Sequence, residues 1–200
     1  MKHEGWASLL DAIGVALSGE QIQRLETYEG LLREQAATYG MIAASDLPRL
    51  RERHLQDSLR AVPLLAATAS AYDLGSGAGL PGIPLAIALP DLQVTLVETR
   101  RKRAAFLEAV LDTLGLANAA VHNGRVENLQ GSVDACLARA FARPREAWEA
   151  AVPLLLPEGR LVYFAGERFT RENCPDGVLV SLFRTPSLAR SGPLVIMSRQ

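Results

Sequence analysis

Four glycines follow a short apolar run in the stretch Ala71-Tyr-Asp-Leu-Gly-Ser-Gly-Ala-Gly-Leu-Pro-Gly-Ile-Pro84. Glycine permits positive φ and a close approach of backbone to a ligand, and the N–H groups that open the following helix can bind anionic or polar ligand atoms. A second apolar run, residues 94–97, ends in Glu98, where an acid suits the diol of a ribose. The pattern predicts a loop that binds a nucleotide cofactor.

Two cofactor chemistries fit this loop. The segment Gly77-Ala-Gly79-Leu-Pro-Gly82 satisfies the G-x-G-x-x-G pattern of dinucleotide binding, which would make the protein a nicotinamide-dependent oxidoreductase. The first glycine of that pattern, however, lies two residues beyond Gly75, with which the turn after the predicted strand begins. Pro81 and Pro84 also remove N–H donors that a pyrophosphate needs. Asp73 beside the glycines suits the ammonium and sulfonium charges of S-adenosylmethionine better than a diphosphate. The residues therefore favour the methyl donor and leave the nicotinamide cofactor as the alternative.

Composition sets the size and surroundings of the protein. With 200 residues, 48% of them hydrophobic, we expect one domain over 1–200, with an N-terminal helical cap at 1–66 and a cofactor-binding core at 67–200. A net charge of −1 gives no general attraction to nucleic acid or membrane, so a polyanionic partner must meet a local basic patch. We expect a monomer.

The two cysteines, Cys136 and Cys174, are too few for a disulfide framework and lack metal-ligand spacing. We expect no metal and a reducing, cytoplasmic location. The first residues contain no apolar signal core, and no apolar run is long enough for a membrane span.

Helical spacing of apolar residues dominates the segment before the loop. Residues 21–39 are predicted to form an amphipathic helix through Ile22, Leu25, Tyr28, Leu31, Leu32 and Ala36. A second helix is predicted from Asp46 to about residue 60, with Pro48 in its first turn. Its apolar face would carry Leu47, Leu50, His54, Leu55 and Leu59. The residues expected to point mostly away are Arg49, Arg51, Glu52, Arg53 and Arg60.

Strands and helices alternate after the loop. Strands are predicted near 71–74, 93–98, 119–123, 134–138 and 160–165, and helices near 82–89, 100–114 and 144–156. Such alternation predicts an α/β fold with a parallel sheet covered on both faces. Two further runs, 178–184 and 193–198, have no helical pattern between them and predict a C-terminal antiparallel hairpin, an ending expected of methyltransferases rather than dehydrogenases.

Three segments carry a resemblance to one family: D-L-G-S-G-A-G-L-P-G-I-P-L-A-I at 73–87, V-E-T-R-R-K-R-A-A-F-L at 97–107 and R-H-L-Q-D-S-L at 53–59. In this order they are similar to the RsmG family, also called glucose-inhibited division protein B (GidB), over about residues 53–166. The resemblance implies a class I methyltransferase fold, Rossmann-like with a mostly parallel seven-stranded sheet. It also implies methylation of N7 of one guanine in 16S rRNA near the decoding site, in naked rRNA or in the 30S particle.

The resemblance further implies the roles of particular residues. S-adenosylmethionine would be bound by Asp73, Gly75, Ser76, Gly77, Gly79, Leu80, Glu98, Val126, Glu127 and Arg139, with Glu98 on the ribose and Val126-Glu127 beside the adenine. Arg139, in A-R-A-F at 138–141, is the candidate catalytic residue. Because guanine N7 carries a lone pair and no proton, no general base is needed, and Arg139 would position the base through its planar fork.

The sequence departs from the family in two places. Tyr39-Gly-Met-Ile-Ala43 stands where the family has Asn-Leu-Thr, and Ala165 stands where it has a lysine before the glycine that ends the fifth strand. A third hypothesis is therefore a non-catalytic RNA-associated protein that retains the fold.

Several polar residues have a structural and a functional interpretation. His54 is either a packed helix residue or part of the site, and Asp57 would pair with it, Arg53 or Arg60. The run at 100–103 opens a helix, where positive charge opposes the macrodipole, so it would contact RNA phosphate or form a solvated face with Glu98 and Glu108. The residues that could add a local basic surface are Arg49, Arg51, Arg53, Arg143 and Arg145.

Overall fold

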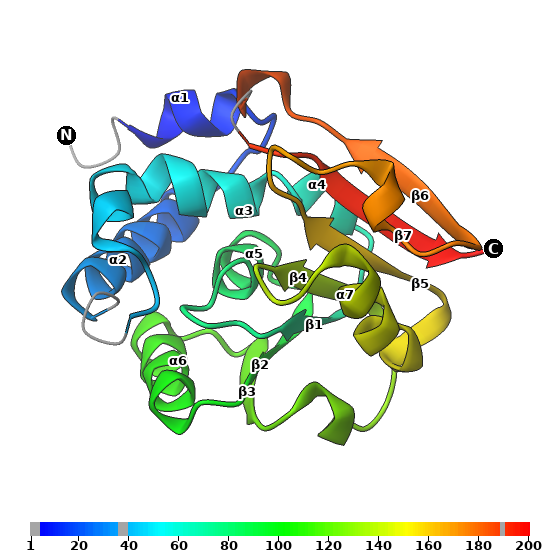
Figure 1. The fold of residues 1–200 in the computed structure, drawn as a ribbon. Coiled ribbons are helices and arrows are strands. Elements are labelled where there is room, and N and C mark those ends of the chain that lie inside the picture. Colours follow the sequence, from blue (N-terminus) through cyan, green and yellow to red (C-terminus); the bar gives the residue numbers. More distant parts are fainter. Residues whose placement is uncertain (1–4, 36–39, 189–190) are drawn as a thin grey trace.

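A seven-stranded sheet runs through the centre of the computed structural model, which describes residues 5–35, 40–188 and 191–200 (Figure 1). The strands are β1 (Ser70–Leu74), β2 (Gln93–Glu98), β3 (Ala119–Asn123), β4 (Val133–Arg139), β5 (Leu155–Phe164), β6 (Val178–Phe183) and β7 (Leu194–Arg199). Their order is β3-β2-β1-β4-β5-β7-β6. Strands β1 to β5 pair in parallel, whereas β7 is antiparallel to both β5 and β6. The predicted sheet and the C-terminal hairpin are confirmed.

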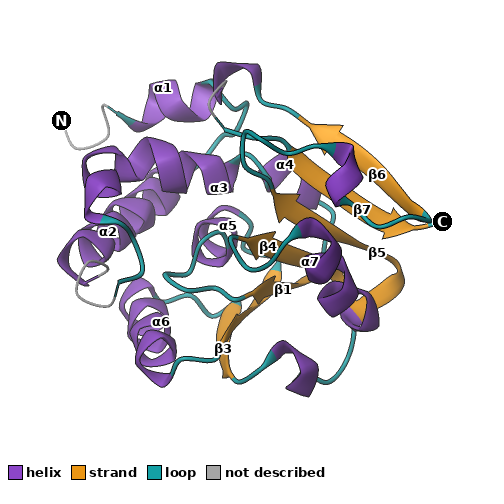
Figure 2. Cartoon of the chain, viewed as in Figure 1, coloured by secondary structure: helices purple, strands orange, loops and turns teal. Residues whose placement is uncertain are grey.

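Two buried clusters lie on the two faces of this sheet because successive strand residues point to opposite sides. Helices α5 (Gly82–Ala88) and α6 (Arg101–Leu114) contribute to one cluster, together with the N-terminal helices. Helix α7 (Pro144–Ala151) contributes to the other. Figure 2 shows the helices on either side of the central strands and the β6–β7 pair at one edge. None of the helices within the described ranges is long and apolar enough to cross a membrane.

The N-terminal segments form a layer beside α5 (Figure 1). They are α1 (Trp6–Asp11), α2 (Gly19–Gln35), the 3-10 turn η1 (Ala44–Arg49), the π-helical turn η2 (Arg51–Gln56), α3 (Asp57–Leu59) and α4 (Val62–Leu65). The predicted helix 21–39 is confirmed through Gln35, while Ala36 and Tyr39 lie outside the described residues. The second predicted helix is instead divided into η1, η2 and α3, with Pro48 inside the 3-10 turn.

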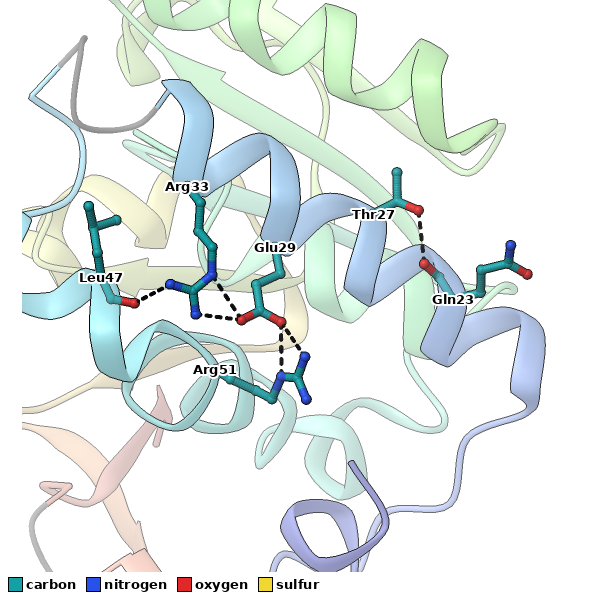
Figure 3. Close-up of polar contacts among 6 residues, drawn as sticks. All are labelled: Gln23, Thr27, Glu29, Arg33, Leu47 and Arg51. Carbon is teal, nitrogen blue, oxygen red and sulfur yellow. Dashed lines mark hydrogen bonds and ion pairs between the residues drawn. The ribbon is translucent and has the colours of Figure 1, made fainter. Parts of the chain in front are cut away.

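Glu29 ties this layer together (Figure 3). Its side chain is 7% exposed and forms ion pairs with Arg33 at 2.8 Å and Arg51 at 2.7 Å. Arg33 also donates to the Leu47 carbonyl at 2.7 Å, and the Arg51 guanidinium lies 4.8 Å from the centre of the Trp6 ring. One buried carboxylate therefore links α1, α2, η1 and η2.

Three expectations about the fold are wrong in detail. Arg60 was expected to point away, but it is 2% exposed because it pairs with Asp57, donates to the Gly192 carbonyl and lies against the Phe164 ring. The predicted helix 144–156 ends at Ala151, before Pro153, which cannot supply the N–H that would continue it. Strand β5 consequently begins at 155 rather than 160.

Candidate active site

The glycine loop bends sharply between β1 and α5. Gly75 and Gly77 have φ of +69° and +57°, a conformation that residues with a Cβ rarely adopt. Gly75 is exposed and Gly77 is half-buried, so bare backbone faces outward at both positions. The Phe141 ring covers Gly75 closely enough that a Cβ there would lie 2.7 Å from Phe141 Cδ2. The bend therefore offers backbone, rather than side chains, to a ligand.

The other predicted loop residues turn into the protein. The Ser76 hydroxyl donates to the Asp73 carbonyl at 2.9 Å, and the side chains of Ser76 and Leu80 are buried. Asp73 is 1% exposed, and its Oδ2 accepts the N–H of Gly82 at 3.0 Å. In the structure this carboxyl is bonded to the backbone of the loop itself, and its predicted place beside the charges of a ligand stays a prediction.

Burial sets the electrostatics of Asp73. Loss of solvation raises the pKa of its carboxyl to about 7, although the hydrogen bonds from Gly82 and Ser76 oppose the shift. The burial of Asp73 and its hydrogen bond from Gly82 are compatible with a structural role for this residue.

Glu98 is buried beside the bend. Its Oε2 accepts the N–H of Gly77 at 3.1 Å and its Oε1 accepts the N–H of Arg100 at 2.8 Å. The Asn123 side chain donates to the Glu98 carbonyl at 2.8 Å and fixes the end of β2. The sequence-based placement of an acid beside the glycines is thus reproduced, and this acid, which is 5% exposed, bonds directly to the backbone of the bend at Gly77.

The two residues predicted beside an adenine follow β3. Val126 and Glu127 lie in a 3-10 turn, η3 (Val126–Asn128), with Val126 buried and Glu127 exposed. A buried apolar residue next to an exposed acid at this end of the sheet is compatible with a wall for a flat heterocycle.

Arg139 ends β4 and is held from the N-terminal layer. Its Nη2 donates to the Arg53 carbonyl at 3.0 Å and to Nδ1 of His54 at 2.9 Å, and lies 3.5 Å from Oδ2 of Asp57. Its Nη1 is buried and has no hydrogen-bond partner within the described ranges. Nη2 is therefore held by the N-terminal layer, while the N–H donors of Nη1 remain unused.

This contact determines the protonation of His54. Because a guanidinium can only donate, Nδ1 must accept, and the ring is neutral with its proton on Nε2. Asp46 Oδ2 lies 3.3 Å from Nε2 but is misaligned for a hydrogen bond. Burial and the charge of Arg139 lower the pKa of His54, and Asp46 opposes them. His54 is a packed histidine, as the structural interpretation held, and it also supports Arg139.

Arg139 borders a pocket of about 1030 Å³ at the carboxyl ends of β4 and β5. Its charged lining residues are Arg49, Glu52, Arg53, Asp57, Arg139, Glu167 and Arg168. Asp57 forms an ion pair with Arg60 at 2.9 Å. Glu52 and Glu167 form no ion pair among the described residues, so they do not neutralise the arginines of the pocket through direct contact. Four arginines therefore meet in one concavity although the chain as a whole is nearly neutral.

The predicted basic residues converge only in part. Arg49 and Arg53 line the pocket, whereas Arg51 belongs to the Glu29 ion-pair network. Arg143 and Arg145 flank the start of α7 outside the lining. The run at 100–103 opens α6 as predicted, with the first three of its side chains exposed.

Three functional candidates were not assigned a role from sequence. Phe141 covers the bend, Tyr163 lines the pocket, and the hydroxyl of Tyr28 donates to the Ala78 carbonyl inside the glycine loop at 2.7 Å. Phe141 belongs to the A-R-A-F segment, so its position after a strand was a usable signal. Tyr28 gave none, because its spacing is that of any residue on the buried face of a helix.

Known proteins share both the sequence and the fold. The family model GidB, rRNA small subunit methyltransferase G, matches residues 21–176. The ribosomal RNA small subunit methyltransferase G of Sorangium cellulosum is 41% identical over 177 residues, which cover 84% of this chain and 74% of the relative. That of Ralstonia nicotianae is 39% identical over 202 residues, covering 94% and 91%.

Solved structures with low identity share the architecture. A variant of MtNAS in complex with S-adenosylmethionine has a TM-score of 0.58 at 17% identity, covering 90% of this chain and 76% of that one. The mitomycin 7-O-methyltransferase MmcR has a TM-score of 0.60 at 14% identity, covering 89% and 66%. These two structures show that the fold is shared, and nothing more. The family match and the relatives near 40% identity show similarity of sequence. The chain belongs to the GidB family, that of rRNA small subunit methyltransferase G.

Proposed function

We propose that this protein transfers a methyl group from S-adenosylmethionine to N7 of a guanine in 16S rRNA. The observation that carries the proposal is the arrangement at one edge of the sheet. A glycine bend flanked by Glu98 lies at the ends of β1 and β2, and a pocket rich in arginine lies at the ends of β4 and β5. Parallel α/β sheets bind ligands at such an edge, where the strand order reverses.

The residues at the bend fit the cofactor. Exposed backbone at Gly75 and Gly77 can approach it closely, and the Glu98 carboxylate beside Gly77 can accept from a ribose diol. Nη1 of Arg139 is buried and has no hydrogen-bond partner among the described residues, so its donors remain for a carboxylate or a base that reaches it. The direct roles proposed for Glu98, Val126, Glu127 and Arg139 rest on this placement.

Positioning accounts for most of the chemistry that the chain must perform. When bound, S-adenosylmethionine supplies an electrophilic methyl group on a good leaving group. Guanine N7 is a free lone pair, so no residue has to remove a proton. Holding the two reactants in line is worth about 7–11 kcal/mol in favourable systems. Arg139 is suited to fix the base, since its fork can donate to guanine O6 or stack on the ring.

The pocket suits an RNA partner. Arg49, Arg53 and Arg168 line it, and guanidinium groups bind phosphates in bidentate fashion. With a net charge of −1, the protein has to rely on this local concentration of arginine. We expect RNA binding to weaken steeply with salt, and we propose a monomer that acts in the cytoplasm on naked 16S rRNA or the 30S particle.

Of the two rival functions, one conflicts with the fold. A nicotinamide oxidoreductase of the dinucleotide-binding type has a parallel sheet in the order 3-2-1-4-5-6, whereas β7 here inserts antiparallel between β5 and β6. The non-catalytic alternative rests on Ala165, which lines the pocket where the resemblance expects a lysine. This alternative agrees with the proposal on the fold and on RNA association, and differs only in whether the protein transfers a methyl group.

The deciding experiment supplies tritiated S-adenosylmethionine with 30S subunits and, separately, with naked 16S rRNA. Transfer to RNA, with cleavage at one guanine after borohydride and aniline treatment, would support the proposal. Cofactor binding without transfer to either substrate would favour the non-catalytic protein. Transfer to a protein or small molecule would refute the RNA assignment.

A further inference from the structure

Helix α2 contacts the cofactor loop and α5 at both of their ends. Near the start, the hydroxyl of Tyr28 donates to the Ala78 carbonyl at 2.7 Å. Beyond the end of the loop, the side-chain amide of Gln21 donates to the Ile87 carbonyl at 2.9 Å and to the Ala88 carbonyl at 3.1 Å. Residues seven apart in a helix lie on the same face, so one face of α2 holds both ends.

The two contacts differ in what they can control. Gln21 satisfies carbonyls at the last turn of α5, which lack helical partners, so it acts on the bend more weakly, by holding the helix that the loop opens. Tyr28 bonds inside the bend itself, to the residue that follows Gly77, whose N–H is bound by Glu98. The Tyr28 side chain is 0% exposed, so water cannot replace its hydroxyl. A buried carbonyl that loses its partner carries the full cost of desolvation.

We propose that Tyr28 is a positioning residue of the cofactor site, and that α2 acts as a clamp on the glycine loop as well as part of a cap. The inference rests on the proposed function, because it assumes that the bend binds S-adenosylmethionine. Without the hydroxyl, Ala78 has to find another partner, and the bend adopts arrangements that do not bind. The apparent dissociation constant then rises in inverse proportion to the fraction of molecules that keep the binding arrangement.

The test is Tyr28→Phe, which removes one oxygen and keeps the ring that packs in the core. Tyr72→Phe is the matched control, because the Tyr72 hydroxyl also donates to a backbone carbonyl, that of Gln130 at 3.0 Å, away from the glycine bend. Both proteins are titrated with S-adenosylhomocysteine in a calorimeter and unfolded in urea. We expect Tyr28→Phe to raise the dissociation constant about fivefold or more and Tyr72→Phe to change it less than twofold, although both lower the free energy of unfolding.

A merely structural Tyr28 would shift the urea midpoint and leave the affinity within twofold of wild type, which would overturn the proposal. If Tyr28→Phe does not fold, Gln21→Met decides. A rise of about threefold in its dissociation constant supports the clamp, and an unchanged value refutes it.

Failure of wild type itself to bind S-adenosylhomocysteine would reject the proposed function instead. Amide exchange would then report on the clamp alone. Gly79 and Leu80, whose N–H groups bond to the Ser76 carbonyl, should exchange faster in Tyr28→Phe than in Tyr72→Phe. Equal rates would overturn the clamp.

Discussion

The guanidinium of Arg139 donates to Nδ1 of His54 over 2.9 Å, across 85 positions of the sequence. This bond joins the end of β4 to the π-helical turn of the N-terminal layer. It occupies Nη2. Nη1 is buried and has no hydrogen-bond partner in the described structure. The guanidinium of the proposed site is therefore oriented by a residue of the N-terminal layer.

Replacing Arg139 should lower methyl transfer more than it lowers stability. We expect Arg139→Ala to reduce kcat/KM for RNA by at least tenfold, because a bidentate contact to a base is worth about 1–3 kcal/mol. Arg139→Lys keeps the charge but loses the planar fork, so it should recover only part of the rate. Tritium transfer to 30S subunits measures both variants. Unchanged turnover in Arg139→Ala would remove this residue from the site.

Acid should inactivate the enzyme through His54. Protonation would place a second cation against the guanidinium of Arg139, so the contact requires a neutral ring. Burial, Arg139 and Arg53 lower the pKa of His54 from its usual value of 6.5, against the opposing charge of Asp46. The ring therefore stays neutral at pH 7, and activity should fall below pH 6.5.

The variant His54→Asn isolates this effect, because its amide oxygen can accept near the position of Nδ1 and does not titrate. We expect its rate profile to lack the acid limb seen in wild type. The same limb in both proteins would assign the titration to another group.

Glu98→Gln should weaken binding of S-adenosylhomocysteine. Glu98→Ala would also disturb the loop, because two backbone N–H groups, those of Gly77 and Arg100, depend on this carboxylate. Glutamine keeps an acceptor for the loop and removes the charge. Hydrogen bonds to charged groups are worth about 1.5–3 kcal/mol, so we expect an affinity loss of about tenfold or more. In calorimetry, the exposed Glu108→Gln should bind as wild type does; equal affinity for Glu98→Gln would contradict the ribose role.

The free energy of unfolding should respond to pH through Asp73. Burial raises the pKa of its carboxyl from 3.8 to about 7, so the folded protein holds this proton where the unfolded chain has released it. Between these two values, wild type should lose stability relative to Asp73→Asn as the pH rises, by at most about 1.4 kcal/mol per pH unit. Above pH 7 the difference should be constant. Urea unfolding of both proteins at several pH values tests this, and parallel curves would show that Asp73 ionises normally.

The elements that could be predicted from sequence are those with strong local patterns. The strand ends at Leu74 and Glu98, the helix that opens at Arg101 and the C-terminal hairpin follow from apolar runs and glycines. The same reasoning failed for Arg60 and did not foresee the burial of Asp73. An acid beside glycines has the pattern of a ligand site whether its side chain points outward or toward Gly82. An arginine such as Arg60, on a helix before the first strand, is expected to be exposed unless its partner on a distant segment is known.

The placement of the predicted site residues agrees with the structure where it depended on strand ends, whereas distant contacts were not foreseen; the roles of these residues toward a ligand stay predictions. Parallel strands place their carboxyl ends together, so the placement of Glu98 and Arg139 at one edge follows from the pattern. The contacts of Tyr28 with Ala78 and of His54 with Arg139 link segments 50 and 85 residues apart. In neither pair does the type or position of one residue reveal which residue is its partner. Such pairs become visible only in the structure, where the N-terminal layer packs against the sheet and its helices.

The position of β7 has a consequence for biosynthesis. This strand lies between β5 and β6, although it is made after both, and Arg199 donates to the carbonyls of Val152, Leu155 and Leu156. While β6 emerges from the ribosome it has no neighbour to pair with, and β5 presents a bare edge. The sheet can close only after Leu194–Arg199 has left the exit tunnel, so a nascent chain stalled before that point would expose two adhesive edges to the crowded cell.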